Sequence, residues 1–232
     1  MKKTCGTIAL LGLALMPLAA GVSAQVDWVS RYIWRGFDLN GNRPCLQPQA
    51  TLELGKSGFT LNLWSCFCLK DRAETKQADE IDATLSYAIP AGESFELEAG
   101  AIVYAYVGAR PFKFKEHTTP EVYLKGGLPH APLAPSLALY YDLNLGKGFY
   151  AQLSVEHSLK LSGKLALDLS GALGYNGRMY IENSGFSDLA FGAALPITLG
   201  QATLTPAVHY SISLLDSVNE DDEFWLGMSV QF

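Results

Sequence analysis

Two arginines lie among aromatic residues near the start of the chain, in the stretch DWVSRYIWRGF at residues 27–37. Burying an unpaired charge is costly, so Arg31 and Arg35 need either water or carboxylate partners. Their spacing of four places both on one side of a helix, but equally on one side of a strand. The secondary structure around them therefore decides what chemistry they can perform.

Histidine and serine residues could provide a hydrolytic site, since a serine nucleophile needs a histidine base. On a strand, His157 faces away from Ser154 and Ser158. His209 shares a face with Ser211, but no third group to orient it is evident. No dinucleotide-binding, phosphate-loop or HExxH motif occurs, and no metal-type cysteine spacing. We expect no enzyme, cofactor or metal site, and a lipid-modifying enzyme remains an alternative.

Alternation of apolar and polar residues dominates the chain from residue 26 onward. In residues 165–175, leucines and a tyrosine occupy one face, and Ala, Asp, Ser and Gly occupy the other. Such a period of two predicts strands with two unlike faces. We count about twelve strands, several long enough to cross a bilayer when tilted. They lie near residues 26–37, 45–54, 59–70, 79–89, 94–107, 117–126, 135–143, 148–160, 164–175, 187–196, 201–213 and 222–232.

The connections between these segments alternate in length. Tight joins such as GKSG, PAGE and LSGK alternate with longer polar ones such as KDRAETKQA and LLDSVNEDDE. Short turns on one side and long loops on the other are typical of an outer-membrane barrel with both termini in the periplasm. The sequence therefore predicts an all-β, transmembrane, antiparallel up-and-down barrel. A secreted β-sandwich or lipocalin-like barrel would show the same alternation.

Residues 1–24 have the features of a cleaved signal peptide: two lysines, a short apolar core and a small-x-small ending at Ala24. We expect export, with residues 25–232 forming one barrel in the outer membrane of a Gram-negative-type bacterium. The final strand alternates and ends at Phe232, which resembles the signal read by the barrel assembly machinery. Outer-membrane lipid and this machinery are the expected partners. The formal net charge of −6 argues against nucleic acid.

A strand over residues 26–37 would place both arginines on the inner face and Trp28, Tyr32 and Trp34 on the lipid face. The arginines would then lie in water or in ion pairs within the lumen. Extending this parity along the chain predicts a mostly acidic lumen wall, whose candidate selectivity residues are Asp27, Arg31, Arg35, Glu53, Glu96, Glu98, Glu121, Glu156 and Asp168.

Residues 29–54 resemble the opening of a family of bacterial proteins assigned as outer-membrane porins, the TorF-like or Gcw_chp group. The matching residues are Ser30, Tyr32, Arg35, Gly36 and Pro44. Similar stretches recur to the end of the chain, so the resemblance covers essentially all of the exported part. It implies an outer-membrane barrel and supplies no catalytic residues.

Three functions follow from these expectations. The first is a narrow passive pore for small solutes or ions, since about twelve strands enclose more space than an eight-stranded barrel and less than a general porin. An acidic wall would make that pore prefer cations. The alternatives are a structural or interaction barrel of the envelope and, third, a lipid-modifying enzyme.

Three cysteines remain after residue 24, an odd number for an oxidising compartment. If Lys56 and Ser57 are the centre of a hairpin turn, Cys45 faces Cys68 on the lumen side. Directly opposed residues are close enough for a disulfide. We therefore predict a Cys45–Cys68 bridge. Cys66 would replace Cys68 if the register slipped by two, and a bulge that kept the cysteines apart would leave free thiols.

Overall fold

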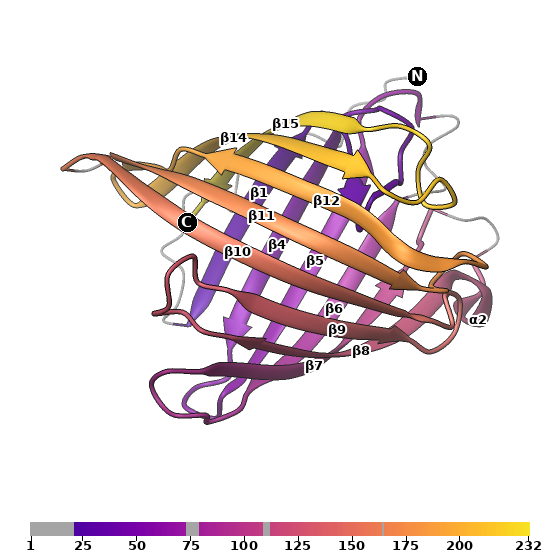
Figure 1. The fold of residues 1–232 in the computed structure, drawn as a ribbon, viewed down its shortest axis with the longest axis horizontal. Coiled ribbons are helices and arrows are strands. Elements are labelled where there is room, and N and C mark those ends of the chain that lie inside the picture. Colours follow the sequence, from indigo (N-terminus) through magenta and orange to yellow (C-terminus); the bar gives the residue numbers. More distant parts are fainter. Residues whose placement is uncertain (1–20, 73–78, 109–111, 164) are drawn as a thin grey trace, which may run out of the picture.

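A computed structural model describes residues 21–72, 79–108, 112–163 and 165–232. Its strands form one closed antiparallel barrel of twelve strands (Figure 1). The barrel strands are β1 (Val22–Val29), β4 (Cys45–Glu53), β5 (Phe59–Cys68), β6 (Glu80–Ala88), β7 (Glu96–Ala105), β8 (Thr118–Gly127), β9 (Ser136–Asp142), β10 (Phe149–Ser162), β11 (Leu165–Gly177), β12 (Ser184–Ala194), β14 (Ala202–Ser213) and β15 (Glu223–Gln231).

Each barrel strand pairs with its neighbour in the chain, and the last strand pairs with the first. A short strand, β13 (Ile197–Leu199), extends the hairpin between β12 and β14. The two ends of the barrel differ as the sequence predicts, with brief connections such as residues 54–58 at one end and longer ones at the other. We call these the short-turn end and the long-loop end. β1 begins and β15 finishes at the short-turn end, where the amide of Phe232 donates to the carbonyl of Ala24.

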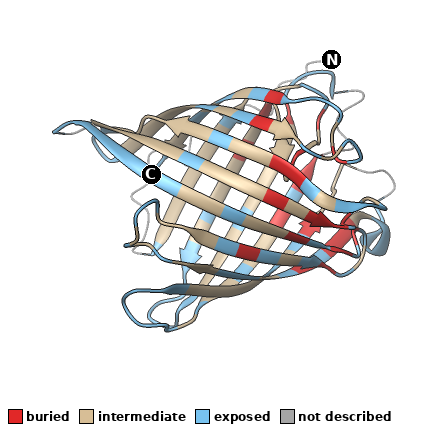
Figure 2. Cartoon of the chain, viewed as in Figure 1, coloured by how far each residue is buried: buried red, intermediate tan, exposed pale blue. Residues whose placement is uncertain are grey.

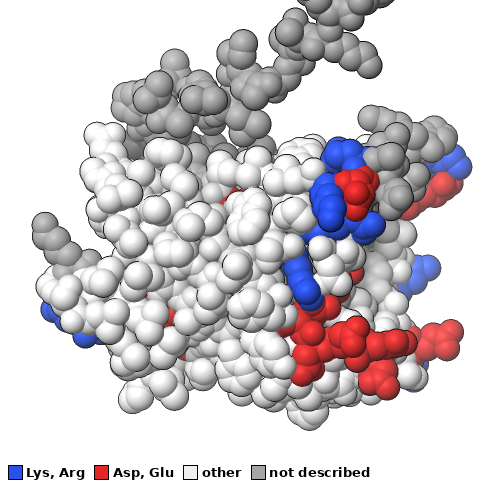
Figure 3. Space-filling view, turned by 90° about the horizontal axis from the view of Figure 1, so that it is seen from above, with Lys and Arg blue, Asp and Glu red and all other residues white. Residues whose placement is uncertain are grey.

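The two faces of the strands are unlike. Outward side chains are apolar and exposed, for example Leu63, Leu139 and Leu153, each about half exposed. The wall seen in Figure 3 is almost free of charged side chains, which gather at one end. Inward side chains between them are polar, and many near the long loops are buried. Among the described residues no helix is long and apolar enough to span a membrane; α2 (Phe114–His117) is a single turn.

Eleven of the predicted strands occur within a few residues of their expected bounds. The first is wrong in its second half. β1 ends at Val29, and the chain then forms a small separate hairpin, β2 (Ile33–Trp34) and β3 (Phe37–Asp38). The predicted signal peptide falls mostly on residues 1–20, which lie outside the described residues. Its last three residues, 22–24, belong to β1 and pair with β4, where Val22 lies opposite Leu52.

The local conformation explains why the strand stops. Trp34 pairs with Phe37 across a two-residue turn, in which Arg35 and Gly36 have φ of 52° and 86°. Two consecutive positive φ angles characterise the type I′ hairpin turn, and glycine adopts such an angle at little cost. The Asp38 carboxylate then accepts hydrogen bonds from the amides of Gly41 and Asn42, which holds the following turn.

The turn at residues 54–58 sets the predicted register between β4 and β5. Cys45 faces Cys68, and Leu46 faces Phe67. Because the amide of Leu69 bonds to the carbonyl of Pro44, the two cysteines form the adjacent non-hydrogen-bonded pair, in which Cα atoms approach most closely. In the structure Cys45, Cys66 and Cys68 are all buried free thiols, so the bridge itself stays a prediction.

We expect the protein isolated from an oxidising envelope to carry the Cys45–Cys68 bridge. Alkylation after denaturation without reductant, followed by peptide mapping, should label Cys66 alone. Cys66→Ala should leave the bridge intact, whereas Cys68→Ser should abolish it. Three labelled thiols would contradict the bridge. A disulfide-linked Cys45–Cys66 peptide would show that Cys45 bonds to its diagonal neighbour and not to Cys68.

Adjacent positions on β10 test the assignment of faces. Leu153 points outward and Ser154 points into the lumen. Leu153→Arg should lower the free energy of unfolding in liposomes by roughly 2–4 kcal/mol, the cost of an arginine facing hydrocarbon at mid-bilayer. Ser154→Arg should change it far less. Urea titration of both variants measures this, and equal losses would contradict the assigned faces.

Candidate functional site

The segment between β1 and β4 folds into the barrel at the long-loop end. We call residues 30–44 the inserted segment. The segment is not a strand of the barrel wall. Its side chains contact inward-facing residues of several barrel strands. Buried residues accordingly gather in this half of the barrel (Figure 2). The contacts that hold the segment are built around Arg35, at the tip of the β2–β3 hairpin.

Arg35 forms a two-pronged ion pair with Glu121 of β8. Its Nη1 and Nη2 atoms each lie 2.7 Å from a different carboxylate oxygen. The side chain of Arg35 is 8% exposed and that of Glu121 is fully buried. The parallel geometry suits a planar guanidinium, and each charge supplies the partner that the other requires when water is removed.

Aromatic rings enclose the same guanidinium. Its central carbon lies 4.1 Å from the ring centroid of Tyr140, 4.4 Å from Trp34 and 4.9 Å from Tyr150. Each is within the range of a cation–π interaction, which gains strength where the site is desolvated. Burial alone would lower the pKa of Arg35, but the hydrogen bonds to Glu121 and the nearby negative charge raise it overall. The guanidinium therefore stays charged in its buried position.

Other contacts tie the inserted segment to further strands. Arg31 pairs with Glu223 of β15. The hydroxyl of Tyr32 donates to Glu80 of β6 at 3.3 Å, and its ring lies 5.5 Å from that of Trp64 on β5. Asn40 bridges within the segment and to the barrel: its Oδ1 accepts from the Tyr32 amide and its Nδ2 lies 2.6 Å from the sulfur of Cys45.

The tip of the hairpin is closely packed. The ring of Trp34 meets Tyr104 of β7 and Tyr180, which follows β11, edge to face at 5.8 and 6.0 Å. A Cβ at Gly36 would lie only 3.1 Å from Asp188 of β12 and 3.0 Å from Val218. The inserted segment thus reaches from β5 round to β15 and fills the long-loop half of the lumen.

Two buried carboxylates that accept hydrogen bonds from hydroxyl groups and amides stabilise the loops around the tip. Asp142 accepts from the hydroxyls of Thr119 and Tyr180 and from backbone amides of residues 144, 146 and 147. Asp188 accepts from Ser187 and Tyr150. Their roles were not predicted from the sequence, because long-range partners leave no local pattern.

Glu80 and Asp82 of β6 differ from these acids. Both are almost completely buried, and Oδ1 of Asp82 has no hydrogen-bond partner among the described residues. No three His, Cys, Asp or Glu side chains in the described part of the chain converge on a possible metal position. These residues form an acidic lining beside the inserted segment.

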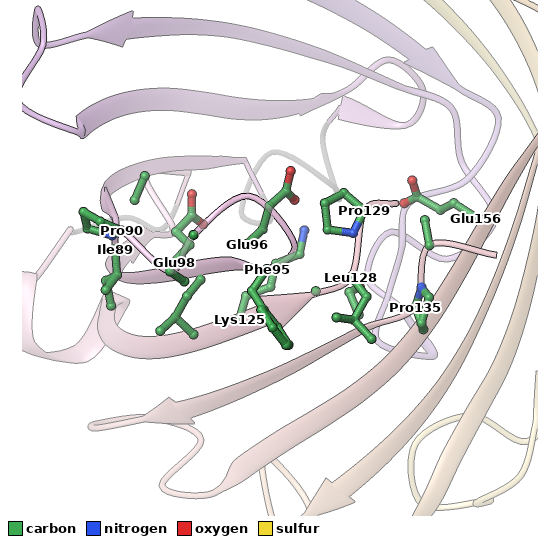
Figure 4. A pocket seen from close by; sticks show the side chains of 17 residues that line it. Ile89, Pro90, Phe95, Glu96, Glu98, Lys125, Leu128, Pro129, Pro135 and Glu156 are labelled. Carbon is green, nitrogen blue, oxygen red and sulfur yellow. The ribbon is translucent and has the colours of Figure 1, made fainter. Parts of the chain in front are cut away.

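The short-turn half of the lumen is hollow. A cavity of about 780 Å³ lies between the turns at residues 88–92 and 127–129, where Glu96, Glu98 and Glu156 point to the same side as Lys125 (Figure 4). Two further cavities, of about 440 and 250 Å³, continue along β10–β12 and share the lining residues Glu156, Ser170 and His209. Open space therefore extends from this end of the barrel to mid-height.

The predicted lumen residues occupy different environments. Asp27, Glu98, Glu121, Glu156 and Asp168 belong to inward-facing rows, and Glu53 lies exposed near the short-turn end. They are spread along the barrel and do not meet at one point. Arg31 and Arg35 lie inside the barrel, but not on a strand face, so their predicted place on the wall is wrong.

The same error affects the aromatic residues of the opening stretch. Trp28 on β1 is partly exposed on the outer face, as predicted. Tyr32 and Trp34 contact lumen residues and do not face lipid. The adjacent residues Arg35 and Gly36 were the sequence signal for this two-residue turn, since a turn with positive φ angles favours glycine. Of the histidines, His157 is exposed on the outer wall, and His209 stacks on Trp225 inside.

The chain belongs to a family described as "Bacterial protein of unknown function (Gcw_chp)", whose model matches residues 18–211. None of the curated proteins compared with the chain matches it.

Solved outer-membrane barrels share the fold. KdgM porin is 12% identical, with a TM-score of 0.56 over 90% of this chain and 98% of its own. NanC porin is 10% identical, with a TM-score of 0.51 over 91% and 98%. LpxR from Salmonella typhimurium is 9% identical, with a TM-score of 0.53 over 90% and 99%. At these identities the likeness concerns the fold alone, which is that of porin-type outer-membrane barrels.

Removing one member of the Arg35–Glu121 pair should strongly destabilise the protein. Arg35→Met leaves Glu121 buried without its cation, which costs about 3–5 kcal/mol for a buried pair. Arg43→Met is the matched control: Arg43 pairs with Asp71 in a more exposed position, and such pairs contribute about 1 kcal/mol or less. Urea unfolding in liposomes compares the two.

The double variant Arg35→Met/Glu121→Gln should recover part of the loss, because no unpaired charge then remains buried. Additive losses in Arg35→Met and Glu121→Gln would contradict a direct coupling between the two side chains.

Proposed function

We propose that the protein is a narrow passive pore for small solutes or ions in the outer membrane, with a preference for cations. The observation that carries the proposal is the series of cavities that runs up the lumen from the short-turn end to mid-height. A barrel that served only as a scaffold would not need this hollow half. The inserted segment restricts the passage at the other end.

The charge of the wall supports the preference for cations. The charged residues that line the 780 Å³ cavity are three glutamates and one lysine. Deeper in the lumen, Arg35 is matched by Glu121 and Arg31 by Glu223, which leaves the other acids to set the sign of the potential. A passage lined with carboxylates concentrates cations and repels anions.

Export and membrane assembly belong to the same proposal. Residues 1–24 would direct the chain across the inner membrane and be removed. The alternating strand β15, which ends next to Phe232, would be recognised by the barrel assembly machinery. The apolar outer wall would then contact outer-membrane lipid.

A structural or interaction barrel without transport is the second candidate, and the inserted segment favours it. Its packing leaves Tyr32 and Met179 almost fully buried in the long-loop half. If the segment never moves, solutes must pass around it or not at all. A lipid-modifying enzyme has less support, because His157 and His209 lack the geometry of a catalytic pair.

Single-channel recording in planar bilayers tests the pore. Replacing residues 33–38 with a glycine–serine linker should raise the conductance roughly two- to threefold, since conductance grows with the open cross-section. The same replacement of residues 112–117, which lie at the same end, should leave conductance near the wild-type value. In a salt gradient, the reversal potential should show cation selectivity.

Heat-modifiable migration on a gel shows whether each variant has folded as a barrel. No channels in either the wild type or the folded linker variant would contradict the pore and favour the structural barrel. Channels selective for anions would contradict the proposed charge preference while leaving the pore intact.

A further inference from the structure

One row of inward-facing residues crosses five neighbouring strands at mid-height. Glu156 of β10 pairs with Ser170 of β11, which pairs with Gly192 of β12. Gly192 in turn pairs with His209 of β14, and His209 with Trp225 of β15. Adjacent strands lie ~4.8 Å apart, so about 14 Å of wall separates the backbones of Glu156 and His209.

The middle of this row is a notch. Ser170 and Gly192 are small, and a Cβ at Gly192 would lie 2.5 Å from the Ser170 hydroxyl and 3.3 Å from Nδ1 of His209. Because Gly192 has no side chain, the Ser170 hydroxyl and the His209 ring can lie directly above it and form the floor of the notch. The larger side chains, Glu156 on one side and His209 with Trp225 on the other, form the walls.

An aromatic stack forms one wall of the notch. The rings of His209 and Trp225 lie 5.0 Å apart and only 13° from parallel. Their outward neighbours Tyr210 and Phe224 are exposed on the outer face, so the stacked rings face the lumen. A flat or cationic group can pack on such rings.

Carboxylates form the opposite wall. Asp168 lies two residues from Ser170 on the same face of β11 and lines the 440 Å³ cavity together with Glu156. Neither acid has an ion-pair or hydrogen-bond partner among the described side chains, and no lysine or arginine lines this cavity or the adjoining 250 Å³ one. The space is large enough for a small molecule and negative on one side only.

We propose that this notch is a subsite for a small organic cation and determines which solutes the pore favours. The ammonium or guanidinium group would contact Glu156 and Asp168, and the remainder of the molecule would pack against the rings of His209 and Trp225. Inorganic cations need only the acidic wall, and a neutral sugar would offer hydroxyl hydrogen bonds to the carboxylates but no positive charge. The aromatic stack facing the acids selects molecules that combine a positive charge with an apolar or flat body. The role of the notch in solute selectivity rests on the proposed pore function. Binding of the organic cation at the notch does not depend on it.

Isothermal titration of the full-length protein in detergent with benzylammonium tests the subsite. Benzyl alcohol and benzoate are the neutral and anionic controls of the same shape. We expect saturable binding of benzylammonium, at least tenfold weaker binding of benzyl alcohol, and none of benzoate, since a charge-assisted contact contributes more than a tenfold change in affinity.

Variants separate the two walls. Glu156→Gln and His209→Ala should each weaken benzylammonium binding about tenfold, and Glu53→Gln, a lumen-side glutamate outside the cavities, should not. Gly192→Val should abolish binding, because its side chain would displace the Ser170 hydroxyl and the His209 ring. Circular dichroism and heat-modifiable migration confirm that each variant is folded.

Equal binding of benzylammonium and benzyl alcohol, or no effect of Glu156→Gln and His209→Ala in folded protein, would overturn the subsite. Conductance is recorded separately on the same samples. Channels without benzylammonium binding would overturn the subsite and leave the pore standing. Binding without channels would overturn the pore and keep the subsite as a ligand pocket of a closed barrel.

Discussion

A single guanidinium, that of Arg35, must remain charged inside a barrel where water has been excluded by aromatic rings. Such a charge is tolerated only with a matched partner, and Glu121 supplies both oxygens at 2.7 Å. The constraint acts in both directions, because Glu121 is itself fully buried and would be an uncompensated anion without Arg35. The hairpin that carries Arg35, the tyrosines that enclose it and the loops that Asp142 and Asp188 hold all depend on this pairing.

The strand pattern was largely predictable, and the physical reason is the bilayer. A wall with lipid outside and a polar lumen inside imposes strict alternation on every spanning strand, so eleven strands and the β4–β5 register could be derived from local sequence. Short turns also fix register locally, which is why Cys45 opposite Cys68 could be anticipated.

The inserted segment could not be predicted from alternation. In residues 30–37 both arginines fall on one side and Tyr32 and Trp34 on the other, although Ile33 and Phe37 share the side of the arginines. Such a pattern does not distinguish a strand that continues from one that turns back into the lumen. The deciding residues are Arg35 and Gly36, whose positive φ angles form a two-residue turn. Glu121, Tyr140 and Tyr150 lie 86 to 115 residues from Arg35 along the chain, and no local signal reports contacts at that distance.

The lumen is divided into a packed half and a hollow half, and the division assigns a different role to each set of charges. Near the long loops, acids and arginines are paired or hydrogen-bonded and stabilise the closed arrangement. Near the short turns, Glu156, Asp168 and the glutamates of β7 line open space and act on whatever enters it. In the proposed pore, selectivity would therefore belong to the hollow half and restriction to the packed half.

Residues 30–44 lie inside the barrel and are not part of its wall. Nuclear Overhauser contacts of the Trp34 indole in detergent micelles test this position. The structure predicts cross-peaks to the rings of Tyr104 and Tyr180, whose centroids lie about 6 Å away, and none to detergent alkyl chains. Cross-peaks to the detergent chains with none to either tyrosine would place Trp34 on the outer wall and contradict an inserted segment.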